Sequence, residues 1–401
     1  MRTVFDSTAG FPIRLVPLPQ FSDALLREVE SFGVRSTKIQ GSIISGRADW
    51  SAVYRCMYCC RLAMRILLPV SETRIQDRKD LYSLASAVPW ESLFQEGMTL
   101  AVDVQGYHRA FTRTSFAALV VKDAIADRCR NKTGHRPSVD TEHPDVRIHL
   151  FIDDDYPAVL SLDVAGGSLH RRGLRHPDSP APLNEVLAAS ILDHANYSPA
   201  RPLYDPFCGY GTFVVEALMR LLAIPAGYFR FKDYQPWLAF QSRESWLAVK
   251  AEVHAAMEMR LRAAGKLKSP LLYAADIDQD AVVGTQAVME KIRSEFALEQ
   301  LPVCVQQQDA LEPDLPLEIR EGAGLLVTNP PYGQRISTED ISALYREFSL
   351  VAKKYLPRWR MYVLSGNRAA DKAFALRTFE RMRVYNGQIE CNLLAADILP
   401  V

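Results

Sequence analysis

Apolar residues in the first half of the chain recur at two spacings, which predicts a mixture of strands and helices. Alternating runs at residues 13–18, 36–48 and 99–108 predict strands. Helical spacing predicts helices over residues 21–33, ending at Gly33, and over residues 115–134, capped by Ser115 and ending at Gly134. Residues 49–70 predict a helix that runs into a strand. Residues 146–166 predict a hairpin through an aspartate-rich turn. This half is therefore expected to form small α+β units.

The pattern changes at about residue 166. A connector rich in glycine, proline and basic residues, GGSLHRRGLRHPDSPAP, is followed by short apolar strands that alternate with longer helices. This alternation predicts a doubly wound parallel α/β sheet. The chain closes with RMRVYNGQIECNLLAADIL, where Asn386-Gly387 predicts a hairpin between two antiparallel strands.

Composition does not decide the functional class of the protein, but it narrows the expected cellular location. The 401 residues are 48% hydrophobic and 23% charged with zero formal net charge, as in ordinary soluble proteins with two or three domains. No apolar run suits a signal peptide or a membrane span, so we expect a cytoplasmic location and no membrane partner. Cys56 and Cys59 have zinc-like spacing but lack a second ligand pair, so we expect buried helix thiols and no metal.

The first strand of the second half ends in the turn LYDPFCGYGT, which contains Asp205, Gly209 and Gly211. Glycines at a strand-to-helix turn let backbone amides approach a ligand near the positive end of the helix dipole. A tight turn without a ligand would have the same pattern. Asp276 ends the next strand, where an acid commonly receives ribose hydroxyls. Asp309 follows the third strand and is as compatible with a loop acid as with a ligand for an adenine amino group.

The fourth strand runs into the corner Asn329-Pro330-Pro331-Tyr332, and its prolines stop the strand. Asn329 and the carbonyl of Pro330 offer two acceptors, and Tyr332 offers a flat ring. This arrangement suits a planar group that carries NH2. Holding both amino hydrogens favours a pyramidal nitrogen and stabilises a transition state in which that nitrogen attacks an electrophile.

The motifs DPFCGYGT, AADID, QQQDA and TNPPYG, in this order before a terminal hairpin, resemble Rossmann-like S-adenosyl-L-methionine methyltransferases. The segments GGSLHRRGLR, APLNEVLAASIL and VYNGQIECNLL are similar to bacterial 23S rRNA guanine-N2 methyltransferases with a THUMP domain, in the amino-terminal half of the larger two-module enzymes. The resemblance implies strand order 3-2-1-4-5-7-6. It also implies a ferredoxin-like domain at residues 1–65, a THUMP RNA-binding domain at 66–165 and a methyltransferase domain at 166–401.

The resemblance further implies roles for individual residues. The catalytic residues would be Asn329, Pro330, Pro331 and Tyr332. The residues that bind S-adenosyl-L-methionine would be Asp205, Cys208, Gly209, Gly211, Asp276, Ile277, Asp309 and Asn329. The expected reaction is direct in-line methylation of a guanosine N2 in 23S rRNA or in a large-subunit assembly intermediate.

Two basic clusters lie near the expected domain boundary and are candidates for contact with an RNA backbone. The solvated face of a helix is the alternative for each residue. The candidates are Arg109, Arg113, Lys122, Arg128, Arg130, Lys132, Arg136, Arg171, Arg172 and Arg175.

Other functions remain open from the sequence. A tRNA guanine-N2 methyltransferase would share both the corner and the THUMP domain. Adenine N6 in a nucleic acid and the side-chain amide of a protein glutamine are also planar NH2 groups that the corner could hold. A non-enzymatic RNA-binding role would require degenerate cofactor positions, and these positions are all present.

Overall fold

The computed structural model describes residues 10–174, 183–236, 241–267, 269–333 and 338–399. The chain divides into two compact units, and each is described by itself below. The first comprises residues 1–169 with 233–250, and the second comprises residues 170–232 with 251–401.

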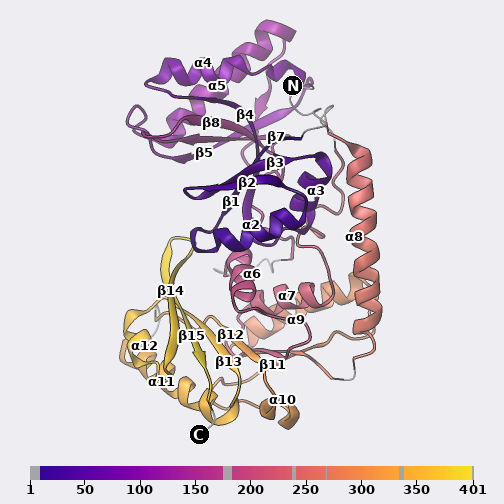
Figure 1. The fold of residues 1–401 in the computed structure, drawn as a ribbon, viewed down its shortest axis with the longest axis vertical. Coiled ribbons are helices and arrows are strands. Elements are labelled where there is room, and N and C mark those ends of the chain that lie inside the picture. The colour runs from indigo at the N-terminus through magenta and orange to yellow at the C-terminus, as the bar shows by residue number, and fades with distance from the viewer. Residues whose placement is uncertain (1–9, 175–182, 237–240, 268, 334–337, 400–401) are drawn as a thin grey trace. The chain divides into compact units, whose positions relative to one another are not determined.

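The first unit is built on one eight-stranded sheet of order β2-β3-β1-β4-β8-β7-β5-β6 (Figure 1). Most neighbours are antiparallel, but β5 pairs in parallel with both β6 and β7. The strands are β1 (Phe11–Pro17), β2 (Arg35–Gln40), β3 (Ile43–Ala48), β4 (Ala63–Thr73), β5 (Thr99–Gly106), β6 (Ser138–Val139), β7 (Val146–Ile152) and β8 (Ala158–Asp163). Strands β7 and β8 confirm the predicted hairpin.

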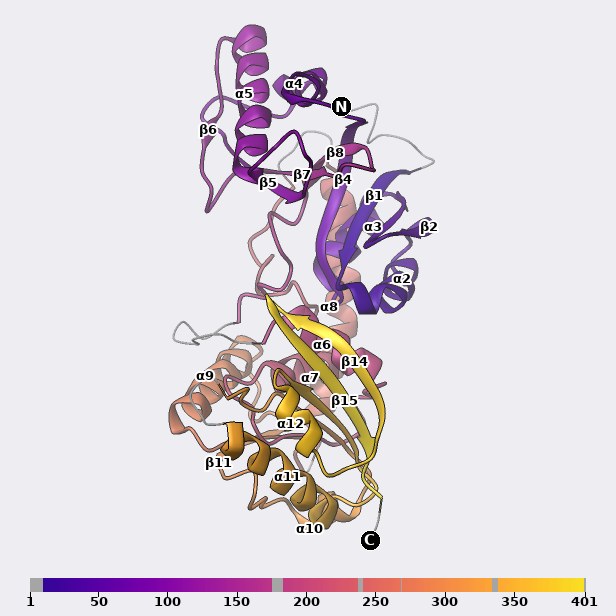
Figure 2. The ribbon, with the colours of Figure 1, turned by 90° about the vertical axis from the view of Figure 1, so that its left-hand side faces the viewer.

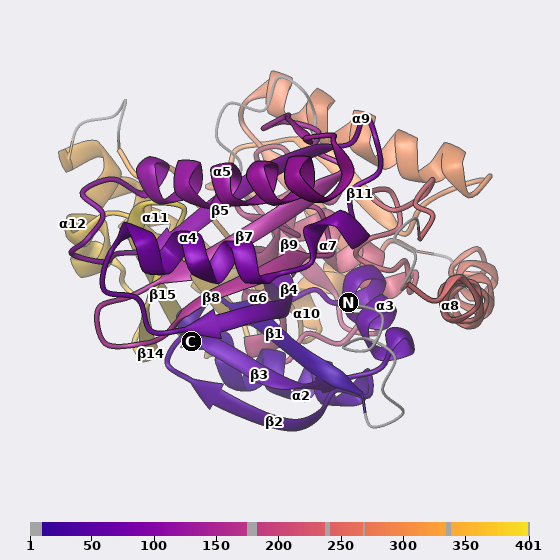
Figure 3. The same cartoon turned by 90° about the horizontal axis from the view of Figure 1, so that it is seen from above.

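Among the described residues, the helical segments of this unit that precede the connector are η1 (Pro19–Phe21), α2 (Ser22–Ser31), α3 (Trp50–Cys59), α4 (Arg78–Ala87), η2 (Trp90–Ser92) and α5 (Thr114–Thr133). Figure 3 shows α4 and α5 side by side over the strands. Gly134 ends α5 with φ of +80°, as predicted, but the helix begins after Arg113. The predicted cap at Ser115 is therefore wrong, because Ser115 already lies inside the first turn.

The first part of helix α8 (Arg243–Ala264) belongs to the first unit although it follows the connector in sequence. Trp246 is fully buried there and its ring lies 5.5 Å from that of Tyr54 and 5.4 Å from that of Tyr58. Strand β4 spans the predicted boundary at residue 65 and pairs with both β1 and β8. The predicted domain boundaries stay predictions.

The second unit has a seven-stranded sheet of order β11-β10-β9-β12-β13-β15-β14. Counted within this sheet, the order is 3-2-1-4-5-7-6, which confirms the predicted topology. The first five strands are parallel, and β15 pairs antiparallel with β13. The strands are β9 (Leu203–Asp205), β10 (Leu272–Asp276), β11 (Val303–Gln307), β12 (Leu325–Thr328), β13 (Arg360–Ser365), β14 (Thr378–Asn386) and β15 (Ile389–Asp397).

Helices cover both faces of this sheet, because the crossovers run in opposite directions from β9 and a right-handed crossover then uses opposite faces. Helices α7 and α9 connect β9, β10 and β11, while α11 packs its apolar residues against β12, β13 and β15. The helices of this unit are α6 (Glu185–His194), α7 (Thr212–Leu221), the second part of α8, α9 (Gln279–Glu295), α10 (Leu317–Glu321), α11 (Thr338–Tyr355) and α12 (Arg368–Ala373).

The terminal hairpin is confirmed, and Figure 2 shows β14 and β15 running side by side. Asn386 is the last paired residue, opposite Ile389, so the two loop residues are Gly387 and Gln388. Gly387 has φ of +63°, which glycine adopts without steric strain at the first position of such a turn. The turn is thus displaced by one residue from the predicted Asn386-Gly387 pair.

Candidate active site

The turn after β9 is held against the end of β10 by hydrogen bonds that its backbone amides donate. The amide of Gly209 donates to Oδ2 of Asp276 at 2.8 Å, and the amide of Cys208 donates to the carbonyl of Ala275 at 2.9 Å. Gly209 has φ of +51° and open space where a side chain would begin. At Gly211, with φ of +80°, a Cβ would lie 2.7 Å from Cγ2 of Thr285. Both glycines are therefore required, and the space above Gly209 suits a ligand.

Asp205 lies beneath this turn and not on its surface. It is 1% exposed, and its Oδ1 accepts from the Thr328 hydroxyl at 2.7 Å and from the Phe207 amide at 3.3 Å. Thr328 immediately precedes Asn329, so Asp205 joins the glycine turn to the corner. Because its carboxylate is buried, the structure favours a positioning role for Asp205, and its binding of the cofactor stays a prediction. The Cys208 side chain is likewise buried, so only its backbone can line the turn.

Burial raises the pKa of Asp205 to about 7, although the Thr328 hydroxyl and the Phe207 amide oppose the shift. The folded protein therefore keeps this proton to higher pH than the unfolded chain, whose value is near 3.8. The stabilisation from this group is complete below about pH 4 and is lost as the pH rises through 7.

We expect Asp205→Asn to flatten that dependence, because an amide does not titrate. Relative to the variant, the wild-type protein should lose about 4 kcal/mol of unfolding free energy between about pH 4 and pH 8. Urea denaturation of the cofactor-free proteins across this range measures the difference. A difference that stays constant with pH would contradict the assignment.

Three further predicted cofactor residues lie at the same edge of the sheet, since parallel strands end on one side. Asp276 is partly buried, which raises its pKa, and its Oδ1 accepts from the Asp278 amide at 3.0 Å. Ile277 is 66% exposed, an uncommon state for an isoleucine, and it offers an apolar surface. Asp309 follows β11, is exposed, and its Oδ1 accepts from the Leu311 amide at 2.9 Å. These residues fit a nucleoside with a ribose and an adenine ring.

The corner after β12 is internally hydrogen-bonded. The Tyr332 hydroxyl donates to Oδ1 of Asn329 at 2.5 Å, and burial raises the pKa of Tyr332 well above its ordinary value, so the hydroxyl keeps its proton. Pro330 is buried and Pro331 is exposed. The side-chain oxygen of Asn329 is therefore placed to accept from a donor at the corner, and in this structure that donor is the Tyr332 hydroxyl.

Sequence reasoning missed the residues that hold Tyr332. Nδ2 of Asn367 donates to the Tyr332 carbonyl at 3.0 Å, and the Cys391 thiol donates to the Tyr332 hydroxyl oxygen at 3.6 Å. A Cβ on Gly366 would lie 2.6 Å from the Tyr332 ring, so only glycine permits this packing. The position of Gly366-Asn367 directly after β13 was a sequence signal for residues near the site. The sequence does not show, however, that Tyr332 lies next to them.

The predicted RNA-binding residues divide into three groups. Arg109, Arg113, Arg130, Lys132, Arg136 and Arg171 are exposed. Lys122 pairs with Asp123, and Arg128 forms a bidentate bond with Glu91 that fixes α5 to η2. Arg172 is 3% exposed and its Nε lies 3.0 Å from Oε1 of Glu216, so its prediction is corrected: a buried, paired guanidinium cannot hold a phosphate. Arg175 lies outside the described residues.

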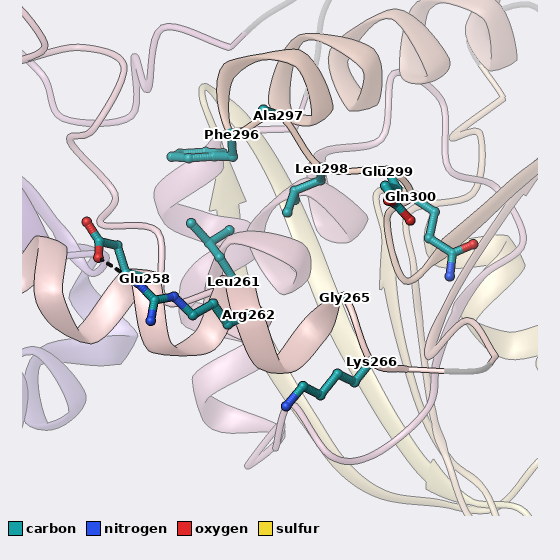
Figure 4. Close-up of a pocket in the computed structure, with 10 residues that line it drawn as sticks. All are labelled: Glu258, Leu261, Arg262, Gly265, Lys266, Phe296, Ala297, Leu298, Glu299 and Gln300. Carbon is teal, nitrogen blue, oxygen red and sulfur yellow. Dashed lines mark ion pairs between the residues drawn. The ribbon is translucent and has the colours of Figure 1, made fainter.

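A groove of about 470 Å³ between the end of α8 and the loop after α9 lies away from this edge (Figure 4). That loop leads into the amino end of β11, whereas ligands of open α/β sheets bind at the carboxyl ends. Arg262 on its wall pairs with Glu258 at 3.6 Å. Among the described residues, no cluster of three or more His, Cys, Asp or Glu is placed to hold a metal. None of the described helices has both the length and the apolar character that a bilayer span requires.

The sheet order, the glycine turn after the first strand and the acid after the second define the fold of the class I methyltransferases. Comparison with known families gives the narrower assignment. Residues 172–395 match the RMKL-like methyltransferase domain, and residues 76–163 match the THUMP domain. The chain belongs to the RMKL-like methyltransferase family.

The relatives agree with this assignment. The ribosomal RNA large subunit methyltransferase K/L of Syntrophotalea carbinolica is 35% identical over 93% of this chain, and the chain spans 51% of that relative's length. A Synechocystis protein named as a candidate RNA methyltransferase is 32% identical, with 93% of each chain covered. The crystal structure of SMU.472 with SAH has the same fold, with a TM-score of 0.76, 20% identity, and 98% and 100% of the two chains covered.

Proposed function

We propose that this protein transfers a methyl group to the N2 amino group of a guanosine in 23S rRNA, in the cytoplasm. The observation that carries the proposal is the corner Asn329–Tyr332, placed at the sheet edge beside the glycine turn and tied to it through Thr328 and Asp205. The THUMP match and the named function of the Syntrophotalea relative support an RNA substrate from the large subunit.

The cofactor residues have separate tasks in this proposal. Gly209 and Gly211 leave room for close approach, Asp276 accepts from ribose hydroxyls, Ile277 packs on adenine and Asp309 accepts from its amino group. S-adenosyl-L-methionine supplies, when bound, a methyl group on a positively charged sulfur.

At the corner, the target amino group replaces the Tyr332 hydroxyl as the donor to Asn329, and its second hydrogen goes to the Pro330 carbonyl. The Tyr332 ring stacks on the base. Holding both hydrogens localises the nitrogen lone pair, which would then be directed toward the methyl group that a bound S-adenosyl-L-methionine would supply. The amino nitrogen afterwards releases one proton to solvent, so no general base is required.

Nucleosides from rRNA and tRNA of cells with and without the protein test the proposal. We expect N2-methylguanosine to fall by one site per 23S rRNA in its absence and to be restored by the wild-type gene. A loss confined to tRNA would assign the enzyme to tRNA instead. An unchanged pattern in both RNAs, with methylated protein glutamine lost, would overturn the nucleic-acid substrate.

RNA affinity is expected to depend on the exposed arginines of the first unit. The double variant Arg109→Ala/Arg113→Ala should bind rRNA fragments about tenfold more weakly near 0.1 M salt, and the slope of log K against log salt should fall by about 1.5. Filter binding across a salt series measures both quantities. The variant Arg35→Ala/Lys38→Ala removes two exposed charges from β2 and serves as the matched control. Equal losses in both variants would contradict a specific role for Arg109 and Arg113.

A further inference from the structure

A polar cavity of about 320 Å³ opens directly beside the catalytic corner. It is formed where β13 ends and β15 begins, and Ser365 pairs with Asn392 across these strands. Its lining residues are Ser365, Gly366, Asn367, Arg368, Glu390, Cys391 and Asn392. Its volume lies near the lower end of the roughly 300–1,000 Å³ typical of small-molecule sites, which suits one nucleobase.

The cavity and the corner share a wall. Asn367 and Cys391 both line the cavity and both bond to Tyr332, and Gly366 lies against the Tyr332 ring. The cavity therefore lies next to the place where a base stacked on Tyr332 would be held.

The cavity offers an acceptor next to a donor. Oε1 of Glu390 accepts from Arg368 at 3.2 Å and lies 3.6 Å from Nε of Arg383, while Oε2 accepts from the Tyr385 hydroxyl at 3.5 Å. Arg368 is 82% exposed at the side chain and Glu390 is 41% exposed, so both groups are open to a ligand. A carboxylate oxygen has no hydrogen to donate, so this side chain serves as the acceptor in the cavity.

The Watson–Crick edge of guanine carries the N2 amino group, the N1–H donor and the O6 acceptor in that order. Asn329 and the Pro330 carbonyl offer acceptors, Glu390 offers a further acceptor and Arg368 offers a donor, and these are the kinds of group that complement that edge. Adenine has an unprotonated N1 and an amino group at C6, so it would turn a lone pair toward the carboxylate. The match is with guanine.

We propose that Glu390 is the residue that selects guanine, by accepting N1–H of the target base while Arg368 donates to O6. The inference rests on the proposed function and adds the residues that distinguish the base. It also gives the exposed ion pair of Arg368 and Glu390 a role in recognising the base, since exposed pairs contribute little to stability.

The test uses transcripts that span the methylated site and carry either guanosine or 2,6-diaminopurine nucleoside at that one position. Both bases have the amino group at C2, but diaminopurine has an unprotonated N1 and an amino group at C6. The full-length wild-type protein should prefer guanine by about 100-fold in kcat/KM. Glu390→Gln can donate from its amide to the unprotonated N1, so its preference should fall below about tenfold.

Glu380→Gln provides the control, because it removes a carboxylate from the same hairpin where Glu380 bonds to His194. It should keep the wild-type preference, and titration with S-adenosylhomocysteine checks that each variant is folded. A Glu390→Gln protein with the wild-type preference, whether active or slowed equally on both transcripts, would overturn the inference and leave the proposed function intact. A wild-type protein that fails to methylate the guanosine transcript would overturn both.

Discussion

Replacing Asn329 with alanine is expected to slow methyl transfer to RNA by about 10²–10³-fold, the loss typical when one preorganised polar group is removed from an active site. The Asn329 oxygen is already placed to accept, since it receives the Tyr332 hydroxyl at 2.5 Å. In the proposed arrangement the glycine turn and Asp276 hold most of the cofactor, so the Kd for S-adenosylhomocysteine should change by less than about tenfold. Single-turnover transfer of labelled methyl groups and calorimetry measure the two quantities.

Two variants at the same corner make this prediction specific. Asn329→Asp keeps an acceptor oxygen and should retain more activity than Asn329→Ala. Tyr332→Phe keeps the stacking ring and removes only the hydroxyl that the target amino group replaces, so its loss should be smaller still. If Asn329→Ala transferred methyl groups at the wild-type rate, the corner would have no part in the mechanism.

The second large effect is on stability. Arg172→Ala is expected to lower the free energy of unfolding by about 3–5 kcal/mol, because it leaves the Glu216 carboxylate buried without its guanidinium partner. Both side chains are almost fully covered, at 3% and 1% exposure, with an Nε–Oε1 distance of 3.0 Å. Urea or thermal denaturation of the full chain measures the loss.

Arg171→Ala is the matched control, since Arg171 is the exposed neighbour and should change stability little. A double variant Arg172→Met/Glu216→Leu removes both charges together and should recover part of the loss. If Arg172→Ala instead weakened RNA binding and left stability unchanged, the burial of this residue would have been misjudged and the RNA role restored.

Much of the second unit, which carries the candidate active site, could be predicted from the sequence because its sequence signals are local. Gly211 must be glycine for the turn after β9, and the prolines after Asn329 must end β12. Alternation of strands and helices fixed the parallel sheet, and Gly387 fixed the final hairpin, although the loop is displaced by one residue. Each of these depends on backbone geometry within a few residues, which a pattern records directly.

Other features depended on contacts between residues far apart in the chain. Arg172 belongs to a basic connector that predicts phosphate contact, but in the structure it pairs with Glu216, 44 residues later. Trp246 follows the connector but packs against Tyr54 and Tyr58 in the first unit, which no local pattern indicates.

The sequence by itself determined the alternation of strands and helices, the glycine turn and the proline corner, since these follow from backbone conformations that only certain residues adopt, whereas the strand order was implied by the family resemblance. The tertiary structure alone decided that Asp205 is buried under the turn and that Glu390 lines a cavity together with Asn367 and Cys391, which bond to Tyr332. The physical reason is that burial and charge pairing are properties of the space around a side chain. Strands and helices that lie far apart in the chain enclose that space, so a local sequence pattern does not reveal it.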